Sequence, residues 1–277
     1  MSNKLGLKLN RFSGLGNKIV LVDLIRQDHQ IDSQLVLNLS KQHAVDFDQL
    51  ISILPPRESD KDFSAEVFNA DGSKANNCIN GARCLGKYIF DTQLSTKPKL
   101  SIEVGDSDWI VSHVKKNIYR VFQRLTELKK REVTLPKENP KGLYELTLFD
   151  ESLEISFINI GNPHAVVFTS NIKKFQLDEW GQQLQQSEYF PEGVNLGVAE
   201  KKSSSNLSLR VYERGVGETL SCGSGACAAV IAGINLGILK GSIQVDFKEG
   251  SLKIEYNEFE NSIRVEGSAN FIEEIEI

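Results

Sequence analysis

Short segments in which apolar and polar residues alternate run along most of the chain. A period of two places the apolar side chains on one face of an extended strand. The clearest of these segments are 5–12, 100–104, 118–122, 207–212, 243–247 and 252–256. The pattern predicts strands of largely antiparallel sheets.

Helical periodicity is less frequent than alternation. Apolar residues recur at helical spacing in the stretches 33–42, 82–90, 175–186 and 225–236. The last stretch is apolar on every side, which is typical of a helix enclosed by its own domain. We therefore predict an α+β protein in which strands form the majority.

An internal repeat is the most informative feature of the residue order. Val67-Phe68 precedes Cys78, and Val211-Tyr212 precedes Cys222 at the same spacing. This block therefore recurs at an offset of 144 residues. Weaker echoes lie upstream, where Gly16-Asn17 recurs as Gly161-Asn162 and Gln49 aligns with Asn195. The repeat predicts two copies of one α/β unit, related by a pseudo-twofold axis.

A charged stretch rich in proline and glycine, from Lys129-Lys130-Arg131 to Gly142, suits an exposed connection between the two copies. We place an N-terminal domain at 1–130, which carries Cys78, and a C-terminal domain at 131–264, which carries Cys222. The tail 265–277 is expected to pack back on the first domain.

Composition sets the broad class. With 277 residues the chain is long enough for two domains with cores of their own. The net charge of -5 comes without a long basic run, which argues against nucleic acid as a partner. No apolar run approaches the length of a membrane span, and the N-terminus lacks the apolar core of a signal peptide. We therefore expect a cytoplasmic protein that does not bind a membrane.

The four cysteines form two close pairs, Cys78 with Cys84 and Cys222 with Cys227. In a cytoplasmic protein, cysteines are more often thiols, metal ligands or catalytic groups than disulfides. Cys84 and Cys227 fall inside predicted helices, so we interpret them as small core residues. A four-cysteine zinc site would need ligands from helix interiors at spacings longer than usual, so no metal is expected.

Cys78 and Cys222 have a different setting. Each precedes a residue that caps helices well, Asn80 or Ser224, and a glycine follows. Each thiol is therefore expected at a helix N-terminus, where backbone N–H groups and the helix dipole favour a thiolate. The same N–H groups can hold a carboxylate. A repeated thiol in this position indicates catalysis rather than packing.

The chemistry that needs two such thiols is inversion of a carbon centre. A base on one face removes the proton, and an acid on the other face returns one. We predict that Cys78 and Cys222 supply this pair, one as thiolate and one as thiol, with the roles exchanged in the reverse reaction. The intermediate carbanion requires helix dipoles and N–H donors at the adjacent carboxylate.

The motifs resemble those of the diaminopimelate epimerase family, and the likeness runs nearly end to end. The matching stretches are Gly14-Leu15-Gly16-Asn17, Phe47-Asp48-Gln49, Phe68-Asn69-Ala70-Asp71-Gly72-Ser73, Asn80-Gly81-Ala82-Arg83-Cys84, Gly161-Asn162-Pro163-His164-Ala165-Val166, Phe190-Pro191-Glu192-Gly193-Val194-Asn195, Tyr212-Glu213-Arg214-Gly215 and the run from Glu218 to Cys227. The resemblance implies interconversion of L,L- and meso-diaminopimelate on the route to lysine and peptidoglycan, without pyridoxal phosphate or metal. It also implies two similar domains, each a sheet or barrel wrapped around a central helix, and a homodimer.

The resemblance further implies roles for individual residues. Cys78 and Cys222 are the acid and the base, while Asn80, with Gly223 and Ser224 through their backbone N–H groups, holds the reacting carboxylate. The other substrate-binding positions are Asn17, Gln49, Asn69, Ile79, Asn162, Asn195, Glu213 and Arg214. Glu213 and amide oxygens suit ammonium groups, and Arg214 suits the distal carboxylate. His164 matches a supporting position beside the thiols, where it tunes or orients them.

Each assignment has a structural alternative. The asparagines could be turn residues, His164 could be a buried structural histidine, and Glu213 and Arg214 could be an exposed ion pair.

The chain departs from the family pattern in its N-terminal half-site. Ile79 stands where the family has a glycine, so a β-branched side chain must fit beside the ligand. Ser13, Lys18-Ile19 and Ala44-Val45-Asp46 replace other family residues. These departures bear more on efficiency and substrate than on reaction class. Two alternatives therefore stay open: a proline or hydroxyproline racemase, and a non-catalytic or thiol-redox descendant of the fold.

Overall fold

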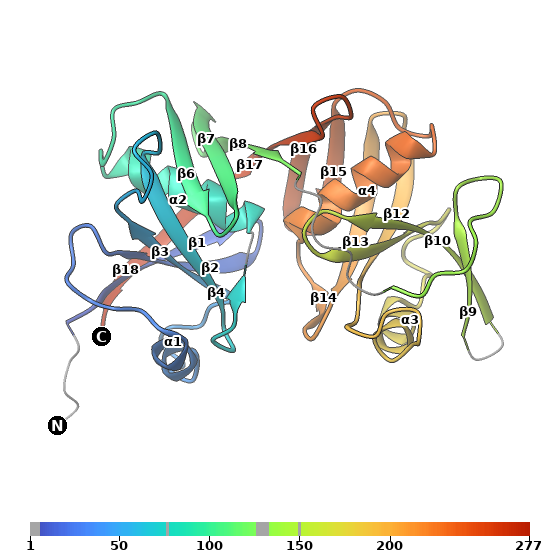
Figure 1. Cartoon of the computed structure of the whole chain (residues 1–277), viewed down its shortest axis with the longest axis horizontal. Helices are drawn as coiled ribbons and strands as arrows, with labels where there is room; N and C mark the ends of the chain where they lie inside the picture. The colour runs from blue at the N-terminus through green and yellow to red at the C-terminus, as the bar shows by residue number, and fades with distance from the viewer. Residues whose placement is uncertain (1–5, 76–77, 126–132, 149–150) are drawn as a thin grey trace. The chain divides into compact units, whose positions relative to one another are not determined.

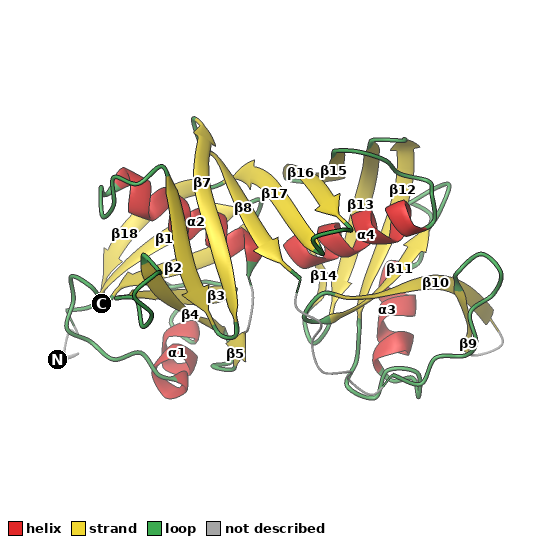
Figure 2. Ribbon diagram, turned by 45° about the horizontal axis from the view of Figure 1, so that its top comes forward, coloured by secondary structure: helices red, strands yellow, loops and turns green. Residues whose placement is uncertain are grey.

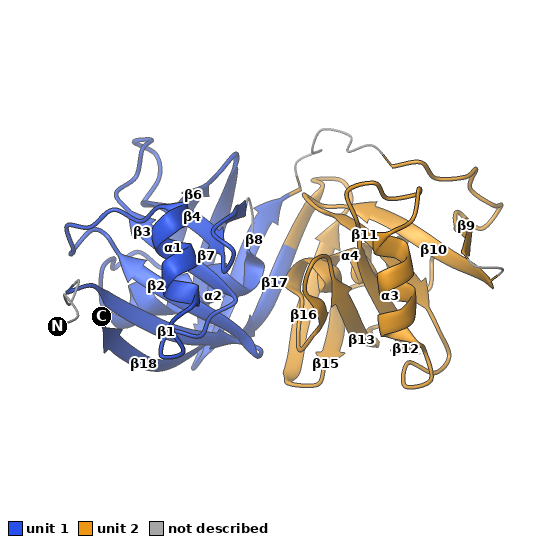
Figure 3. Cartoon of the chain, turned by 90° about the horizontal axis from the view of Figure 1, so that it is seen from below, with its two compact units in different colours: residues 1–124, 264–277 blue, residues 125–263 orange. Residues whose placement is uncertain are grey.

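The computed structural model describes residues 6–75, 78–125, 133–148 and 151–277. It divides into two compact units, one formed by residues 1–124 with 264–277 and the other by residues 125–263 (Figure 3). Residue 5 of the first predicted strand and the predicted connection at 129–131 lie outside the described residues.

The first unit builds strands around one long helix (Figure 1). Its elements are β1 (Lys8–Gly14), β2 (Asn17–Asp23), α1 (Ser33–Ser40), β3 (Gln49–Leu54), β4 (Phe63–Asn69), β5 (Lys74–Ala75), α2 (Ile79–Asp91), β6 (Lys99–Val104), β7 (Ser107–Lys115), β8 (Ile118–Arg124) and β18 (Asn270–Glu276). Strand β17 (Ser262–Ser268) begins in the second unit and ends in the first.

The C-terminal segment closes this unit around α2. Strands β1, β2, β3, β4, β6, β7 and β8 form one series of neighbouring pairs. At its two ends, β17 pairs with β8 and β18 pairs with β1. The chain's last residues therefore complete the ring of strands that surrounds α2 (Figure 2).

Alternation along the strands supplies two cores in the first unit. In β2, Ile19 and Leu21 pack in the cluster that contains α2, whereas Val20 and Val22 pack in the cluster that contains α1. Successive strand residues point to opposite faces, so both faces of this sheet are covered by a helix.

The second unit repeats this succession of elements. It contains β9 (Tyr144–Leu148), β10 (Glu151–Asn159), β11 (Pro163–Phe168), α3 (Leu177–Gln185), β12 (Asn195–Ser203), β13 (Asn206–Glu213), β14 (Gly217–Thr219), α4 (Gly223–Asn235), β15 (Ile243–Phe247) and β16 (Gly250–Asn257). The pairs β10–β11, β11–β12, β12–β13, β13–β15 and β15–β16 have the same directions as β1–β2, β2–β3, β3–β4, β4–β6 and β6–β7. Helix α4 is buried along nearly its whole length, as its apolar sequence predicts.

The prediction of antiparallel sheets holds for most pairs but needs one correction. The pairs β2–β3, β4–β6, β11–β12 and β13–β15 are parallel. In each case a helix lies between the two strands in sequence, and parallel neighbours require such a crossover. The described residues thus form a mixed α/β fold with four helices and mostly sheet. None of these helices has the length and apolar character needed to cross a bilayer.

Candidate active site

Cys78 occupies the N-cap of α2. Its backbone is extended, and its Sγ accepts a hydrogen bond from the N–H of Gly81 at 3.1 Å. The helix begins at Ile79, three residues earlier than predicted, and Asn80 lies within the first turn. The expectation that Asn80 would be the cap is therefore wrong, because the sulfur itself takes the N–H that a capping oxygen would accept.

Cys222 has the same position on α4. Its Sγ accepts from the N–H of Gly225 at 3.3 Å, and the helix begins at Gly223 rather than at Gly225. Ser224 lies in the first turn and is not the cap, for the same reason as Asn80. The N–H groups of Gly223 and Ser224 have no acceptor within their own helix, so they can bind an anion beside the sulfur.

The glycine in each first turn allows close packing. A Cβ on Gly81 would lie 2.2 Å from Cδ1 of Ile51 and 2.9 Å from Sγ of Cys78. A Cβ on Gly225 would lie 3.0 Å from Cγ2 of Val211. The absent side chain lets each helix start lie against a strand of its own unit while its N–H reaches the sulfur.

The Cys222 thiol also contacts the Glu213 carboxylate. Sγ donates to Oε2 at 3.2 Å, and Thr219 Oγ1 donates to the other carboxylate oxygen at 2.6 Å. Burial and then the charge of Glu213 raise the pKa of the Cys222 thiol well above its ordinary value, against the opposing effects of Ser224 and the Gly225 N–H. Cys222 is therefore held as a thiol, which is the form that donates a proton.

A hydrogen-bonded chain leads from this thiol to His164. Ser224 Oγ lies 3.4 Å from Sγ of Cys222, and Asn162 Nδ2 donates to Ser224 Oγ at 3.4 Å. His164 Nε2 lies 3.0 Å from Asn162 Oδ1. Burial, then the charge of Arg214, lower the pKa of His164 to about 3. The neutral imidazole therefore donates through Nε2 and orients Asn162, which connects it to the Cys222 thiol through Ser224.

Asn195 joins three segments of the second unit. Its Nδ2 donates to the carbonyl of Pro163 at 3.1 Å, and its Oδ1 accepts from the N–H of Arg214 at 3.0 Å. The Arg214 guanidinium donates to the Glu192 carbonyl at 2.9 Å. Strands β11 and β12 begin at the same end of the sheet at which β13 ends. The predicted residues of this unit therefore gather at that end.

The first unit gathers its predicted residues at the corresponding end of its sheet, where β2 and β3 begin and β4 ends. Gln49 and Asn69 are paired across β3 and β4, and Gln49 Nε2 donates to Asn69 Oδ1 at 3.0 Å. Asn17 begins β2 and donates to Asp48 at 2.9 Å. Gly14, which pairs with Asn17, lies against Asn80, since a Cβ on it would be 3.1 Å from the Asn80 carbonyl oxygen.

The departures from the family pattern are accommodated locally. Lys18 and Asp46, which both depart from the family pattern, form an ion pair with 2.6 Å between Nζ and Oδ2. Ser13 accepts a hydrogen bond from the N–H of Gly16 at 3.1 Å in the β1–β2 turn. The Ile79 side chain is buried within its unit. These substitutions therefore have partners in the protein itself.

Sequence reasoning missed two residues that shape the site. Thr219 holds the Glu213 carboxylate, and Arg83 donates to Asn80 Oδ1 at 2.9 Å. Both are in motifs that carry the resemblance, but a contact across a hairpin or along a helix face becomes visible only once the register is known. Cys84 and Cys227 are fully buried, as expected of core residues, and burial raises the pKa of Cys84 to about 12.

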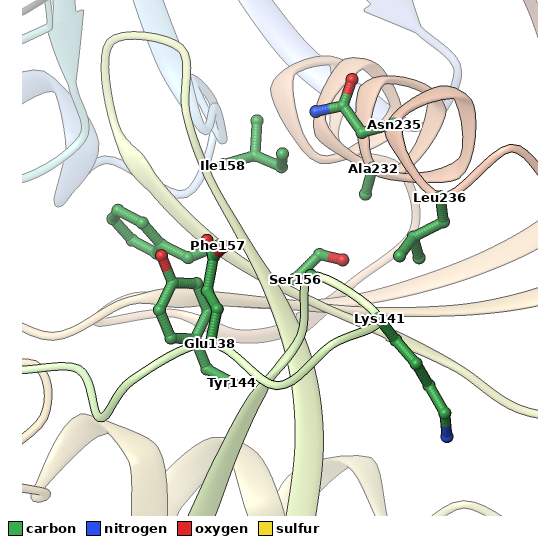
Figure 4. Close-up of a pocket in the computed structure, with 10 residues that line it drawn as sticks. Glu138, Lys141, Tyr144, Ser156, Phe157, Ile158, Ala232, Asn235 and Leu236 are labelled. Atoms are coloured by element: carbon green, nitrogen blue, oxygen red, sulfur yellow. The ribbon is translucent and has the colours of Figure 1, made fainter.

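A cavity of about 240 Å³ lies in the second unit at the carboxyl end of α4 (Figure 4). Its polar lining includes Glu138, Tyr144, Ser156 and Asn235. Cys222 caps the opposite end of this helix, about 20 Å away at 1.5 Å per residue. The cavity contains none of the predicted site residues and is separate from the chemistry described above.

Solved structures share this fold at low sequence identity. A phenazine biosynthesis protein of the PhzF family from Enterococcus faecalis superposes with a TM-score of 0.67 at 13% identity, covering 98% of each chain. A hydroxyproline epimerase from Agrobacterium vitis superposes with a TM-score of 0.62 at 10% identity, covering 98% of this chain and 92% of the other.

Sequence relatives are more specific. A family model for diaminopimelate epimerase matches residues 156–272. The chain is 35% identical over 263 residues to the diaminopimelate epimerase of Acinetobacter baumannii strain AYE, which covers 91% of the chain and 90% of the relative. It is 35% identical over 269 residues to the diaminopimelate epimerase of Teredinibacter turnerae, and this alignment covers 96% of the chain and 97% of that relative. This identity over nearly the whole length shows that the chain belongs to the diaminopimelate epimerase family.

Proposed function

We propose that the protein is an isomerase that interconverts L,L- and meso-diaminopimelate by proton transfer through Cys78 and Cys222. One observation carries the proposal: each unit places a cysteine sulfur at the N-cap of its enclosed helix, where a glycine N–H donates to it at 3.1 or 3.3 Å. Family membership supplies the substrate.

The chemistry follows from the two settings. In the direction in which Cys222 is the acid, Cys78 acts as thiolate, removes the α-proton and becomes a thiol. Cys222 then gives its proton to the opposite face of the carbanion and becomes a thiolate. Ser224 and the Gly225 N–H can stabilise that thiolate, and Glu213 favours its return to the thiol.

The carbanion needs stabilisation that the thiols do not provide. We propose that the N–H groups of Gly223 and Ser224, together with Asn80, bind the reacting carboxylate and neutralise charge as it develops. Glu213 and Arg214, with the amides at the two sheet edges, would bind the remaining ammonium and carboxylate groups. This reaction uses neither pyridoxal phosphate nor a metal.

Two further expectations belong to this proposal. The repeated element order supports two pseudo-symmetric domains.

The family resemblance supports a homodimer. Phe271 and Ile272 on β18 are large apolar side chains that are about half exposed, at 48% and 51%. Sedimentation of the purified protein tests the dimer directly, since a single monomeric species would contradict it.

Incubation with L,L-diaminopimelate in heavy water tests the function. We expect meso product with deuterium at the inverted α-carbon. Proline and hydroxyproline serve as control substrates, and their exchange in place of diaminopimelate would identify a racemase. No exchange with any of these amino acids would identify a non-catalytic descendant of the fold.

A further inference from the structure

Arg83 is a fully buried cation in the catalytic helix of the first unit. It lies in the second turn of α2, and its exposed fraction is 0%. Burial of a guanidinium is unfavourable unless its N–H groups are hydrogen bonded. The contacts it makes therefore indicate why a charged residue occupies this place.

The guanidinium donates hydrogen bonds to oxygen atoms from two segments of the first unit. Nη2 donates to Asn80 Oδ1 at 2.9 Å, Nη1 donates to the Ile79 carbonyl at 3.4 Å, and Nε donates to the Ser268 carbonyl at 3.4 Å. Ser268 ends β17, so Arg83 links the start of α2 to the strand that closes the ring. The planar guanidinium has five N–H donors and can bind acceptors in several directions at once. The single ammonium group of lysine is less suited to such separated acceptors.

The contact with Asn80 determines how this amide is turned. A guanidinium has only donors, so the amide oxygen must face Arg83. Asn80 is 4% exposed, which leaves its side chain little room to turn over.

The second unit has no equivalent cation on its helix. The residue at the 144-residue offset from Arg83 is Cys227, and the sulfur of Cys222 faces the Glu213 carboxylate instead. The two thiol caps are alike in backbone geometry but differ in the charge placed near them. Arg83 lies five residues beyond Cys78, which is about 7.5 Å along the helix axis.

We propose that Arg83 is a positioning residue of the Cys78 half-site, which fixes the Asn80 side chain through its amide oxygen and adds a buried positive charge behind the amino end of α2 that attracts an anionic ligand. The ligand is a carboxylate, and its identity as that of an amino-acid substrate rests on the proposed function. The positive charge attracts the carboxylate, and the fixed Asn80 side chain holds the first turn of α2 in place beside it.

Alkylation of Cys78 by two similar reagents measures this effect without an activity assay. Iodoacetate carries a carboxylate and iodoacetamide does not, and both react with the thiolate. The ratio of their rate constants at Cys78, obtained by peptide mass spectrometry, therefore cancels changes in thiolate fraction. We expect Arg83→Gln to lower this ratio by about fivefold or more, on the scale of one partly screened charge, and Arg83→Lys to lower it less.

Lys87→Gln is the matched control. Lys87 is also buried in α2, but its Nζ pairs with Asp91 at 2.7 Å, one turn further from Cys78. We expect an unchanged ratio in this variant, and an unchanged ratio at Cys222 in every variant. Circular dichroism verifies the fold, and Arg83→Lys provides the test if Arg83→Gln does not fold.

An unchanged ratio at Cys78 in the folded Arg83 variants would overturn the proposal, as would an equal fall in Lys87→Gln. These outcomes do not depend on turnover. Absence of epimerisation by the wild type in heavy water would contradict the proposed function alone.

Discussion

The Cys222 thiol donates a hydrogen bond to the Glu213 carboxylate, with 3.2 Å between Sγ and Oε2. Thr219 fixes the other carboxylate oxygen. Glu213 thus contacts the sulfur directly, in addition to the substrate-binding role that the family resemblance implies. A carboxylate so placed favours the protonated thiol through both its charge and its acceptor oxygen.

The first prediction concerns this pair. Glu213→Gln removes the negative charge, so the pKa of the Cys222 thiol should fall and its alkylation should reach half its maximum at a lower pH. Peptide mass spectrometry at Cys222 provides the measurement. Glu218→Gln is the control, because that carboxylate, on the same hairpin, binds Arg210. An unshifted profile in Glu213→Gln would show that the contact does not control the proton.

The second prediction concerns the two sulfurs. Cys78→Ser and Cys222→Ser should each reduce turnover by at least about 10²-fold, the usual scale for losing a positioned acid or base. Serine is a good N-cap, so thermal unfolding should change little, whereas the alanine variants should also lose about 1 kcal/mol of helix stability. Cys84→Ala and Cys227→Ala should stay active. Near wild-type turnover in either serine variant would refute the two-thiol scheme.

The third prediction concerns the packing of the helix starts. Gly81→Ala should destabilise the protein by about 1–3 kcal/mol because the new methyl group overlaps the Ile51 side chain. Gly225→Ala should cost less, since its nearest contact is 3.0 Å rather than 2.2 Å. Urea denaturation measures both. Adding Ile51→Val should restore part of the loss in Gly81→Ala, and a purely additive double variant would argue against this cause.

The fourth prediction concerns His164. Its folded pKa of about 3 lies below the ordinary value of 6.5. Between these values the unfolded chain binds a proton that the folded protein does not, so this residue should reduce stability as pH falls from 6.5 toward 3. His164→Gln should show a shallower loss in denaturation experiments, whereas the exposed His43→Gln should follow the wild type. Titration of the His164 ring between pH 5 and 8 in NMR spectra would contradict a buried neutral imidazole.

The fifth prediction concerns the distance between the sulfurs in the working enzyme. If Cys78 and Cys222 act on one carbon atom, mild oxidation should join them and inactivate the enzyme, and dithiothreitol should restore activity. Peptide mapping without reductant identifies the linkage. Full activity in oxidant with both thiols still reduced would oppose the scheme.

Local sequence patterns predicted the elements well because they depend on neighbours along the chain. Alternation located β15 at Ile243–Phe247, and the all-round apolar character of α4 predicted its burial. The repeat around Cys78 and Cys222 corresponds to two matching successions of helices and strands. Helix starts were misplaced because capping usually involves oxygen, whereas here a sulfur accepts the N–H bond.

The motifs of the sequence by itself determined the family, the two cysteines and the residue types around them. Only the tertiary structure decided what those side chains contact: Glu213 with Cys222, His164 with Asn162, and Arg83 with both Asn80 and a carbonyl that is 185 residues away in sequence. The physical reason is that hydrogen bonds and buried charges depend on separation in space, which strand register and the closing C-terminal strand establish, whereas periodicity reports only what is near along the chain.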